Sequence, residues 1–317
     1  MKAIKTTIAA LALGGLSISS VNAASLEPGG WTVGVALGAP LPEGVYFVNN
    51  ASVGSWRGVD DDKSTLGIEI PLLFWSTPWT LPGNGRVEVL LATPVISGNI
   101  PQLPQGGYPG WAGRDYTEFY NPVGFVGAAW DLGNGFNFSA FIGGWAPVDN
   151  SLRLFGFDSW VLSERVNLAY VKDGWKFAAN VAFGQPDNTN SYTVLTPVTK
   201  PQVLPDYVNY DLTATKTVGK WEVGLVAFGT SDLSRKPWNS LAGTAVNGTP
   251  FGEQSQFALG GLVGYSFTDF TVQLYGTSDV VSNKYYNLSD ASKSYETRFW
   301  TRAIVPLWNP PALEPLK

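Results

Sequence analysis

The chain has 317 residues, a formal net charge of −5, and neither Cys nor His. Without these residue types it can form no Ser-His-Asp triad, no catalytic thiol and no zinc site built on imidazole or thiolate ligands. The acidic balance argues against nucleic acid as a partner, and no nucleotide-binding glycine motif occurs. We therefore expect no enzyme activity, no cofactor and no bound metal.

Residues 1–23 have the pattern of a secretory signal peptide. Lys2 and Lys5 give a basic start, residues 8–16 are apolar, and Val21-Asn22-Ala23 is a small-residue cleavage site. The apolar stretch is well short of the roughly 20 residues that a spanning helix needs. We expect an exported chain that, lacking disulfides, depends on backbone pairing and packing.

After residue 42 the chain alternates apolar with small or polar residues in short stretches separated by Gly, Asn, Asp and Pro. In one stretch, Phe177, Val181 and Phe183 lie on the face opposite Lys176 and Asn180. Such alternation predicts an all-β protein with two unlike faces on each strand. Twelve strands are predicted, near 43–57, 63–75, 85–97, 117–131, 136–147, 157–172, 174–185, 205–218, 220–230, 254–267, 269–279 and 294–308.

The lengths of the connections distinguish a membrane barrel from a soluble β-sandwich, which would also alternate. Gly133-Asn134-Gly135, Asp173-Gly174, Gly219-Lys220 and Thr268-Asp269 predict tight hairpins. The connections between them are mostly longer. Short turns alternating with long loops are typical of a transmembrane antiparallel β-barrel, with the short turns in the periplasm and the loops outside the cell.

Aromatic residues flank the predicted tight turns and the end of the last strand. At these positions they are expected to form an interfacial girdle at the periplasmic boundary of the membrane. The alternative is that they fill the core of a soluble sandwich. The girdle residues are Trp130, Phe136, Trp175, Trp221, Phe267, Phe270 and Trp308.

Charged residues on the less apolar strand faces are predicted to point into the lumen, because they would be costly against lipid. Adjacent strands could pair Glu69 with Arg86. One hypothesis is that these charges line a constriction whose field selects solutes; the alternative is a salt-bridge network that only holds the interior together. The lumen-lining candidates are Glu69, Arg86, Glu88, Glu296, Arg298, Trp300 and Arg302.

One strand fits the pattern less well, because Glu164 shares a face with Leu162 and Val166. A β-bulge or a position near the membrane interface would explain it.

Residues 24–42 precede the predicted barrel at 43–308, and residues 309–317 form a tail. The Gly-rich, aromatic part at 29–38 is too short to be a domain. It is either a plug inside the lumen or a loose leader, and we favour the leader.

Extended hairpin motifs carry a resemblance to a known family. They are LPEGVYFVNN at 41–50, PLLFWSTPW at 71–79, FYNPVGFVGAAWDLGNGFNFSAFIGGWAPV at 119–148, AYVKDGWKFAANVAF at 169–183, TKTVGKWEVGLVAF at 215–228 and FWTRAIVPL at 299–307. Through them the chain resembles the outer-membrane transporter family associated with meta-pathway phenol degradation. The family has no catalytic motif to transfer.

The resemblance implies a barrel in the outer membrane of a Gram-negative bacterium that passes small, hydrophobic or aromatic compounds. Its expected partners are outer-membrane lipid, the small-molecule solute and the outer-membrane assembly machinery. The alternative is an outer-membrane barrel with a structural or surface-interaction role that transports nothing. The sequence leaves the oligomeric state open.

Overall fold

The computed structural model describes residues 27–57, 63–100, 114–148, 159–187, 202–203, 205–233, 249–250, 255–283 and 295–310. Within these ranges no helix is long and apolar enough to cross a membrane. The strands are β1 (Gly44–Arg57), β2 (Lys63–Leu81), β3 (Gly85–Ala92), β4 (Val95–Ile100), β5 (Arg114–Phe119), β6 (Val123–Gly133), β7 (Phe136–Trp145), β8 (Val161–Lys172), β9 (Trp175–Pro186), β10 (Gln202–Val203), β11 (Tyr207–Val218), β12 (Trp221–Asp232), β13 (Thr249–Pro250), β14 (Ser255–Ser266), β15 (Thr271–Ser282) and β16 (Glu296–Trp308).

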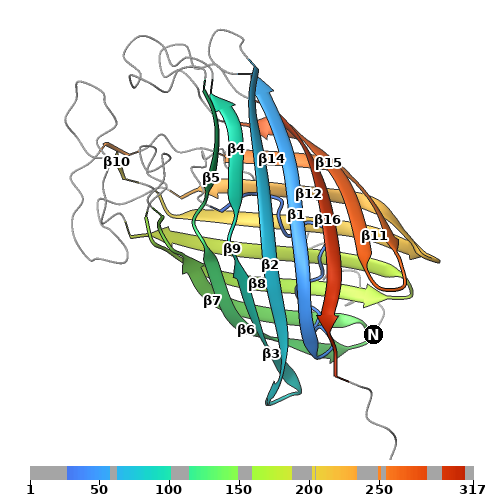
Figure 1. Ribbon diagram of the computed structural model, residues 1–317. Coiled ribbons are helices and arrows are strands. Elements are labelled where there is room, and N and C mark those ends of the chain that lie inside the picture. The colour runs from blue at the N-terminus through green and yellow to red at the C-terminus, as the bar shows by residue number, and fades with distance from the viewer. Residues whose placement is uncertain are drawn as a thin grey trace, which may run out of the picture.

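The main sheet closes on itself, because β1 pairs with β2 on one side and with β16 on the other. Its pairings are all antiparallel, and β3 with β4 and β5 with β6 are two halves of single spans. The result is the predicted closed barrel of twelve antiparallel spans (Figure 1). The two-residue strands β10 and β13 pair with each other outside this sheet.

Prolines interrupt two of the spans that the sequence predicts as continuous. Pro94 separates β3 from β4, and Pro122 separates β5 from β6. A proline has no N–H to give to the ladder, but its carbonyl still accepts. Tyr120 N donates to Pro94 O at 2.8 Å and Ala146 N donates to Pro122 O at 2.9 Å, so the wall stays continuous across both breaks.

The four tight hairpins predicted from the sequence join β6 to β7, β8 to β9, β11 to β12 and β14 to β15. At the second of them Asp173 and Gly174 both have positive φ, 52° and 74°. Positive φ at both central residues is the two-residue geometry whose twist matches antiparallel strands, and Asx-Gly is the pair that adopts it most readily. Hydrogen bonds join neighbouring hairpins, from Val171 N to Gly135 O, from Thr217 N to Gly174 O and from Ser266 N to Lys220 O, so the four lie together at one end of the barrel.

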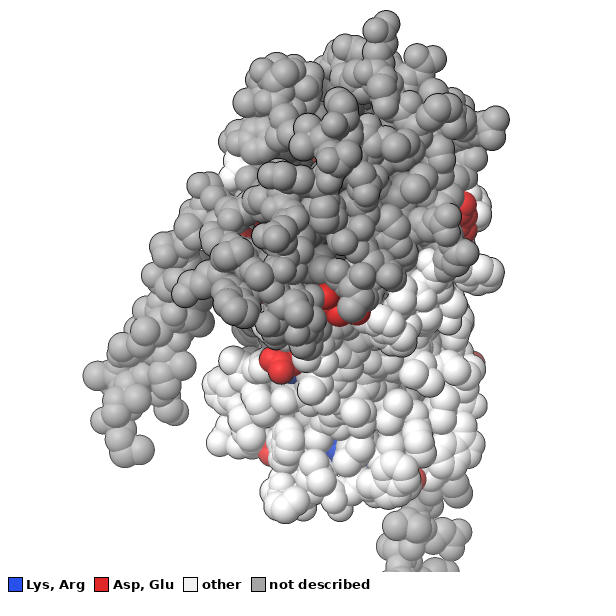
Figure 2. Space-filling model, turned by 90° about the vertical axis from the view of Figure 1, so that its left-hand side faces the viewer, with Lys and Arg blue, Asp and Glu red and all other residues white. Residues whose placement is uncertain are grey.

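The outer face of the barrel is apolar. Leu168 on β8, Leu225 on β12 and Phe299 on β16 are each more than half exposed. Figure 2 shows one side of the molecule, where the described surface has only scattered charged atoms. A continuous apolar surface of this kind suits lipid and not water, which disfavours a soluble sandwich.

Candidate functional site in the barrel lumen

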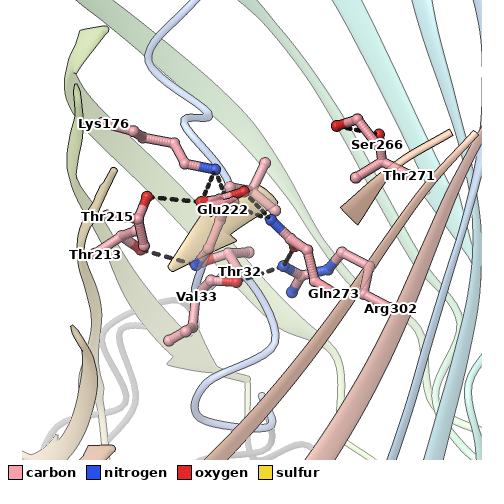
Figure 3. Close-up of polar contacts among 12 residues, drawn as sticks. Thr32, Val33, Lys176, Thr213, Thr215, Glu222, Ser266, Thr271, Gln273 and Arg302 are labelled. Carbon is pink, nitrogen blue, oxygen red and sulfur yellow. Dashed lines mark hydrogen bonds and ion pairs between the residues drawn. The ribbon is translucent and has the colours of Figure 1, made fainter. Parts of the chain in front are cut away.

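The lumen is filled in part by residues 27–42, which we call the lumen segment. Its hydrogen-bond partners include Glu88 on β3, Ser139 on β7, Asp211 on β11 and Arg302 on β16, which lie around the whole barrel. Only a chain inside the barrel can reach all of them (Figures 1 and 3). The favoured expectation of a loose leader is therefore wrong for this part of the chain.

Asp211 is the main acceptor for the lumen segment. Its carboxylate accepts from Gly30 N at 3.0 Å, from Thr32 N at 2.8 Å and from Thr32 Oγ1 at 2.5 Å. Two residues along the same strand face, Thr213 Oγ1 accepts from Gly34 N at 2.8 Å. Hydrogen bonds to a charged acceptor are stronger than neutral ones, so Asp211 fixes the middle of the segment.

Cationic side chains bind the carbonyl oxygens of the same stretch. Arg302 donates to Trp31 O at 2.7 Å, to Val33 O, and to Gln273 Oε1 at 2.9 Å. Lys176 Nζ donates to Gly34 O at 2.7 Å and forms an ion pair with Glu222 at 2.6 Å. Figure 3 shows Lys176, Glu222, Gln273 and Arg302 converging on the segment from different strands.

Glycine lets the lumen segment lie against the wall. Gly30 and Gly34 have φ values of +87° and +81°, which L side chains rarely adopt. A Cβ on Gly34 would lie 2.6 Å from Leu262 Cδ1, and one on Gly30 would lie 2.9 Å from the Phe228 ring. A side chain at either position would push the segment away from its partners.

At one end of the lumen segment, Glu27 and Trp31 contact Arg165 of β8. Glu27 forms an ion pair with Arg165, and Trp31 Nε1 donates to Glu27 Oε1 at 2.7 Å. The Arg165 guanidinium lies 4.8 Å from the Trp31 ring centroid. Trp31 is 2% exposed. These contacts place an indole ring and an ion pair in the interior of the barrel.

At the other end, the segment joins β1 near the tight hairpins. Leu41 N donates to Glu88 Oε1 at 2.9 Å, and Ser76 Oγ donates to Leu41 O at 2.9 Å. Further in, Ser139 Oγ donates to Leu37 O at 2.7 Å. Side chains of β2, β3 and β7 thus hold the chain as it leaves the lumen.

The wall of the lumen has two unlike sectors. Among the buried residues of β8 to β16 polar side chains outnumber apolar ones, whereas the buried residues of β1 to β7 are largely apolar. Val226 and Phe228 of β12 and Leu262 of β14 extend the apolar cluster into the more polar sector. The apolar sector includes Tyr46, Ile68, Ile70, Leu72, Phe74, Leu90, Phe125, Phe141 and Trp145. The polar sector includes Arg165, Asn167, Asn180, Asn209, Asp211, Thr213, Gln273 and Arg302. A solute in the lumen would meet both kinds of surface.

This division explains the wrong prediction for Glu69. Ile68 and Ile70 are buried in the lumen, so Glu69 lies on the outer face, where Asn49 Nδ2 donates to it at 3.1 Å. Glu69 is cross-strand from Val95 and does not pair with Arg86. Instead, Arg86 lies 3.6 Å from Glu43 and donates to Thr77 O at 2.8 Å. Both faces of β2 are apolar, so alternation could not identify the lumen side.

The remaining lumen candidates are spread along the barrel and do not form one ring. Glu88 lies near the tight-hairpin end, and Arg302 lies deeper, against Asn50 of β1. Arg298 forms an ion pair with Glu296 and lies across from Gly54, further toward the opposite end. Trp300, between the two arginines, stacks on Tyr275 at a centroid distance of 5.6 Å. These charges therefore do not form a single constriction in the lumen.

Two features of the outer face bear on the sequence predictions. The side chains at the tight-hairpin end include Phe136, Trp175, Trp221, Phe267, Phe270 and Trp308, all exposed, and Trp130, which donates to Pro82 O at 3.0 Å. Glu164 lies on the outer face of β8 with no register shift in either pairing. The bulge is therefore excluded. Glu164 is the fourth residue of β8, near the end of the strand away from the tight hairpins, which leaves a position near the membrane interface as the explanation.

Several residues that bind the lumen segment were not among the candidates chosen from the sequence. On the barrel wall these are Arg165, Asn180 and Gln273. Glu27 and Trp31, which lie within the segment itself, were not candidates either. In the sequence, the pattern that could have identified the wall residues is the run of polar residues at inward positions of neighbouring strands. Among the described residues, no cluster of three or more His, Cys, Asp or Glu side chains could hold a metal ion.

A solved structure of an outer-membrane channel supports this fold. The crystal structure of the COG4313 outer membrane channel from Pseudomonas putida F1 superposes with a TM-score of 0.62 at 13% identity, covering 89% of this chain and 99% of that one. The Ralstonia pickettii toluene transporter TbuX gives a TM-score of 0.44 at 10% identity, covering 86% and 92%. A search of curated protein sequences gives no match. The family model described as "Putative MetA-pathway of phenol degradation" matches residues 114–289, and the chain belongs to that family.

Proposed function

We propose that this protein is an outer-membrane channel for the passive uptake of small hydrophobic or aromatic compounds, and that the lumen segment closes it. The observation that carries the proposal is the two-sector lumen. An apolar wall gives an aromatic ring a surface to contact, and the opposite polar wall provides hydrogen-bond partners for water and for polar substituents.

The way in which the segment is bound supports a removable closure. None of residues 27–42 belongs to a strand. The segment is held by hydrogen bonds that involve side chains, such as Thr32 to Asp211 and Ser139 to Leu37, by the ion pair of Glu27 with Arg165 and by the ring contacts of Trp31. The main sheet is complete without it, since β1 begins at Gly44 and closes on β16. Release of the segment would therefore open the lumen without breaking the barrel.

Placement in the outer membrane follows from the same reasoning. We propose that the aromatic side chains at the tight-hairpin end form the periplasmic girdle, and that residues 1–23 direct export. Trp221, Tyr265, Phe267 and Phe270 form consecutive ring contacts with centroids 4.4 to 4.7 Å apart. Exposed aromatic rows of this kind suit the interface between headgroups and hydrocarbon.

Solute uptake into vesicles tests the proposal. Vesicles that contain the full chain, or a variant lacking residues 29–38, are placed in isotonic solutions of phenol or of a large sugar. We expect the variant to admit phenol faster than the full chain does, and both faster than vesicles without protein. Equal rates for the variant and the protein-free vesicles would favour the alternative, a barrel that transports nothing.

A further inference from the structure

Trp31 fills an aromatic site in the barrel wall. Its ring centroid lies 6.1 Å from that of Trp145, at an interplanar angle of 65°, and the Arg165 guanidinium lies 4.8 Å from it. The same guanidinium lies 5.1 Å from the Phe125 ring. Edge-to-face aromatic pairs and cation–π contacts both favour an electron-rich ring at this place.

We propose that this site, formed by Phe125 of β6, Trp145 of β7 and Arg165 of β8, is the binding site for the solute. Its ligand is a single aromatic ring that carries a hydroxyl group, and Trp31 occupies the site in the closed channel as a substitute for that ligand. The inference rests on the proposed function, because it assigns the substrate class of the same lumen.

The three wall residues belong to one small area of the barrel. β6 and β7 pair with Val123 opposite Trp145, and β7 and β8 pair with Phe141 opposite Arg165. A Cβ on Gly143 would lie 2.7 Å from Phe125 Cδ1, so glycine at this position gives the Phe125 ring the space to lie close to the neighbouring strand. The wall is thus shaped to present a ring surface beside the guanidinium.

Polar atoms without partners indicate the hydroxyl group. Trp145 Nε1, Arg165 Nε and Asn180 Oδ1 are buried and have no hydrogen-bond partner among the described residues. Arg165, Asn180 and Asp211 surround Trp31 with no room for a water molecule between them, so space for a hydroxyl group appears only when Trp31 leaves. An indole N–H and a guanidinium N–H can donate to a hydroxyl oxygen, and an amide oxygen can accept from it. A hydrocarbon ring would leave these atoms unsatisfied.

Occupation by Trp31 makes the ligand and the lumen segment competitors. A solute that binds only when Trp31 has left raises the population of the released segment by the factor 1 + [L]/Kd. At ten times its dissociation constant, phenol should therefore raise that population about elevenfold. The solute itself would open its channel.

The test uses the absence of Cys from the chain. Ala36→Cys places one thiol on the lumen segment, and Thr268→Cys places one on an exposed hairpin as the control. The rate of reaction with a charged thiol reagent is measured in detergent, with and without phenol, and with cyclohexanol as the aliphatic alcohol of similar size. Folding of both variants is checked by their heat-modifiable migration in electrophoresis.

We expect phenol, and not cyclohexanol, to accelerate labelling at position 36 and to leave position 268 unchanged. Equal effects of the two alcohols at position 36, or no effect of either, would overturn the assignment. A second measurement titrates phenol into the variant lacking residues 29–38. Phe125→Leu should weaken binding by roughly three- to tenfold, whereas Phe74→Leu, another buried lumen phenylalanine, should not; equal effects would also overturn it.

The vesicle assay separates this inference from the proposed function. Phenol uptake without a preference for phenol in the labelling assay would reject only the aromatic site. Preferential labelling without uptake would keep the site and reject the channel.

Discussion

The carboxylate of Asp211 on β11 accepts hydrogen bonds from both the backbone nitrogen and the hydroxyl group of Thr32, 179 residues earlier in the chain. This contact ties the lumen segment to the middle of the polar sector. It also gives the clearest way to loosen the segment without touching the pairing of the barrel strands.

Asp211→Asn should increase the fraction of time that the channel is open. The substitution removes the charge that attracts the segment N–H groups, and hydrogen bonds to a charged group contribute about 1.5–3 kcal/mol each. Every 1.4 kcal/mol lost corresponds to about a tenfold change in the equilibrium between bound and released segment. Single-channel recording gives the open fraction, and Asp269→Asn, in an exposed hairpin, is the matched control.

Arg302 and Arg298 provide a second matched pair, since they lie four residues apart on the same face of β16. Arg302 binds the carbonyl oxygens of Trp31 and Val33, whereas Arg298 binds Ser52 Oγ at 2.9 Å and pairs with Glu296. Arg302→Met should therefore raise the labelling rate of a thiol at position 36. Arg298→Met should leave that rate unchanged, and a similar effect of both would show that Arg302 does not hold the segment.

Trp31→Ala should release the lumen segment while the barrel keeps its stability. Removing a buried Trp side chain costs about 3–5 kcal/mol, and here the loss applies to docking of the segment and not to the strand ladder. We expect a larger conductance than that of the full chain. The temperature at which the barrel loses its heat-modifiable migration in electrophoresis should be unchanged. A fall in that temperature comparable to the effect of a wall substitution would mean that the segment is part of the barrel core.

The lipid-facing surface can be tested with two outward valines. Val166 lies near the middle of β8, and Val218 lies beside the hairpin that ends β11. Val166→Arg should lower the free energy of unfolding in lipid vesicles by about 2–4 kcal/mol, and Val218→Arg by about 0–1 kcal/mol, because the cost depends on depth in the bilayer. Equal costs, measured by urea titration, would contradict a membrane-spanning orientation.

The strand and hairpin positions could be predicted because they depend on local patterns. Residues such as Phe177 to Phe183 alternate clearly, and Asp173-Gly174 has the chemistry of a two-residue turn. The interruption at Pro94 was also visible in the sequence, but the alternation of Val87, Val89 and Leu91 continued to Val95 and hid it. Proline breaks a ladder even where the side-chain pattern continues.

The contents of the lumen could not be predicted in the same way. The rule that charged residues point inward correctly oriented β16, but it failed for β2, where Ile68 and Ile70 line an apolar sector and Glu69 faces outward. The binding of Gly30 and Thr32 by Asp211 depends on closure of the whole barrel. No short-range pattern in residues 27–42 reports partners that lie more than 100 residues away.

The most direct test of the account is the single-channel conductance of the refolded full chain and of the variant lacking residues 29–38, in a planar bilayer with denatured protein as the control. We expect the full chain to show rare or small openings and the variant to show large, steady ones. Identical conductance of the two proteins would contradict the conclusion that the lumen segment closes the channel.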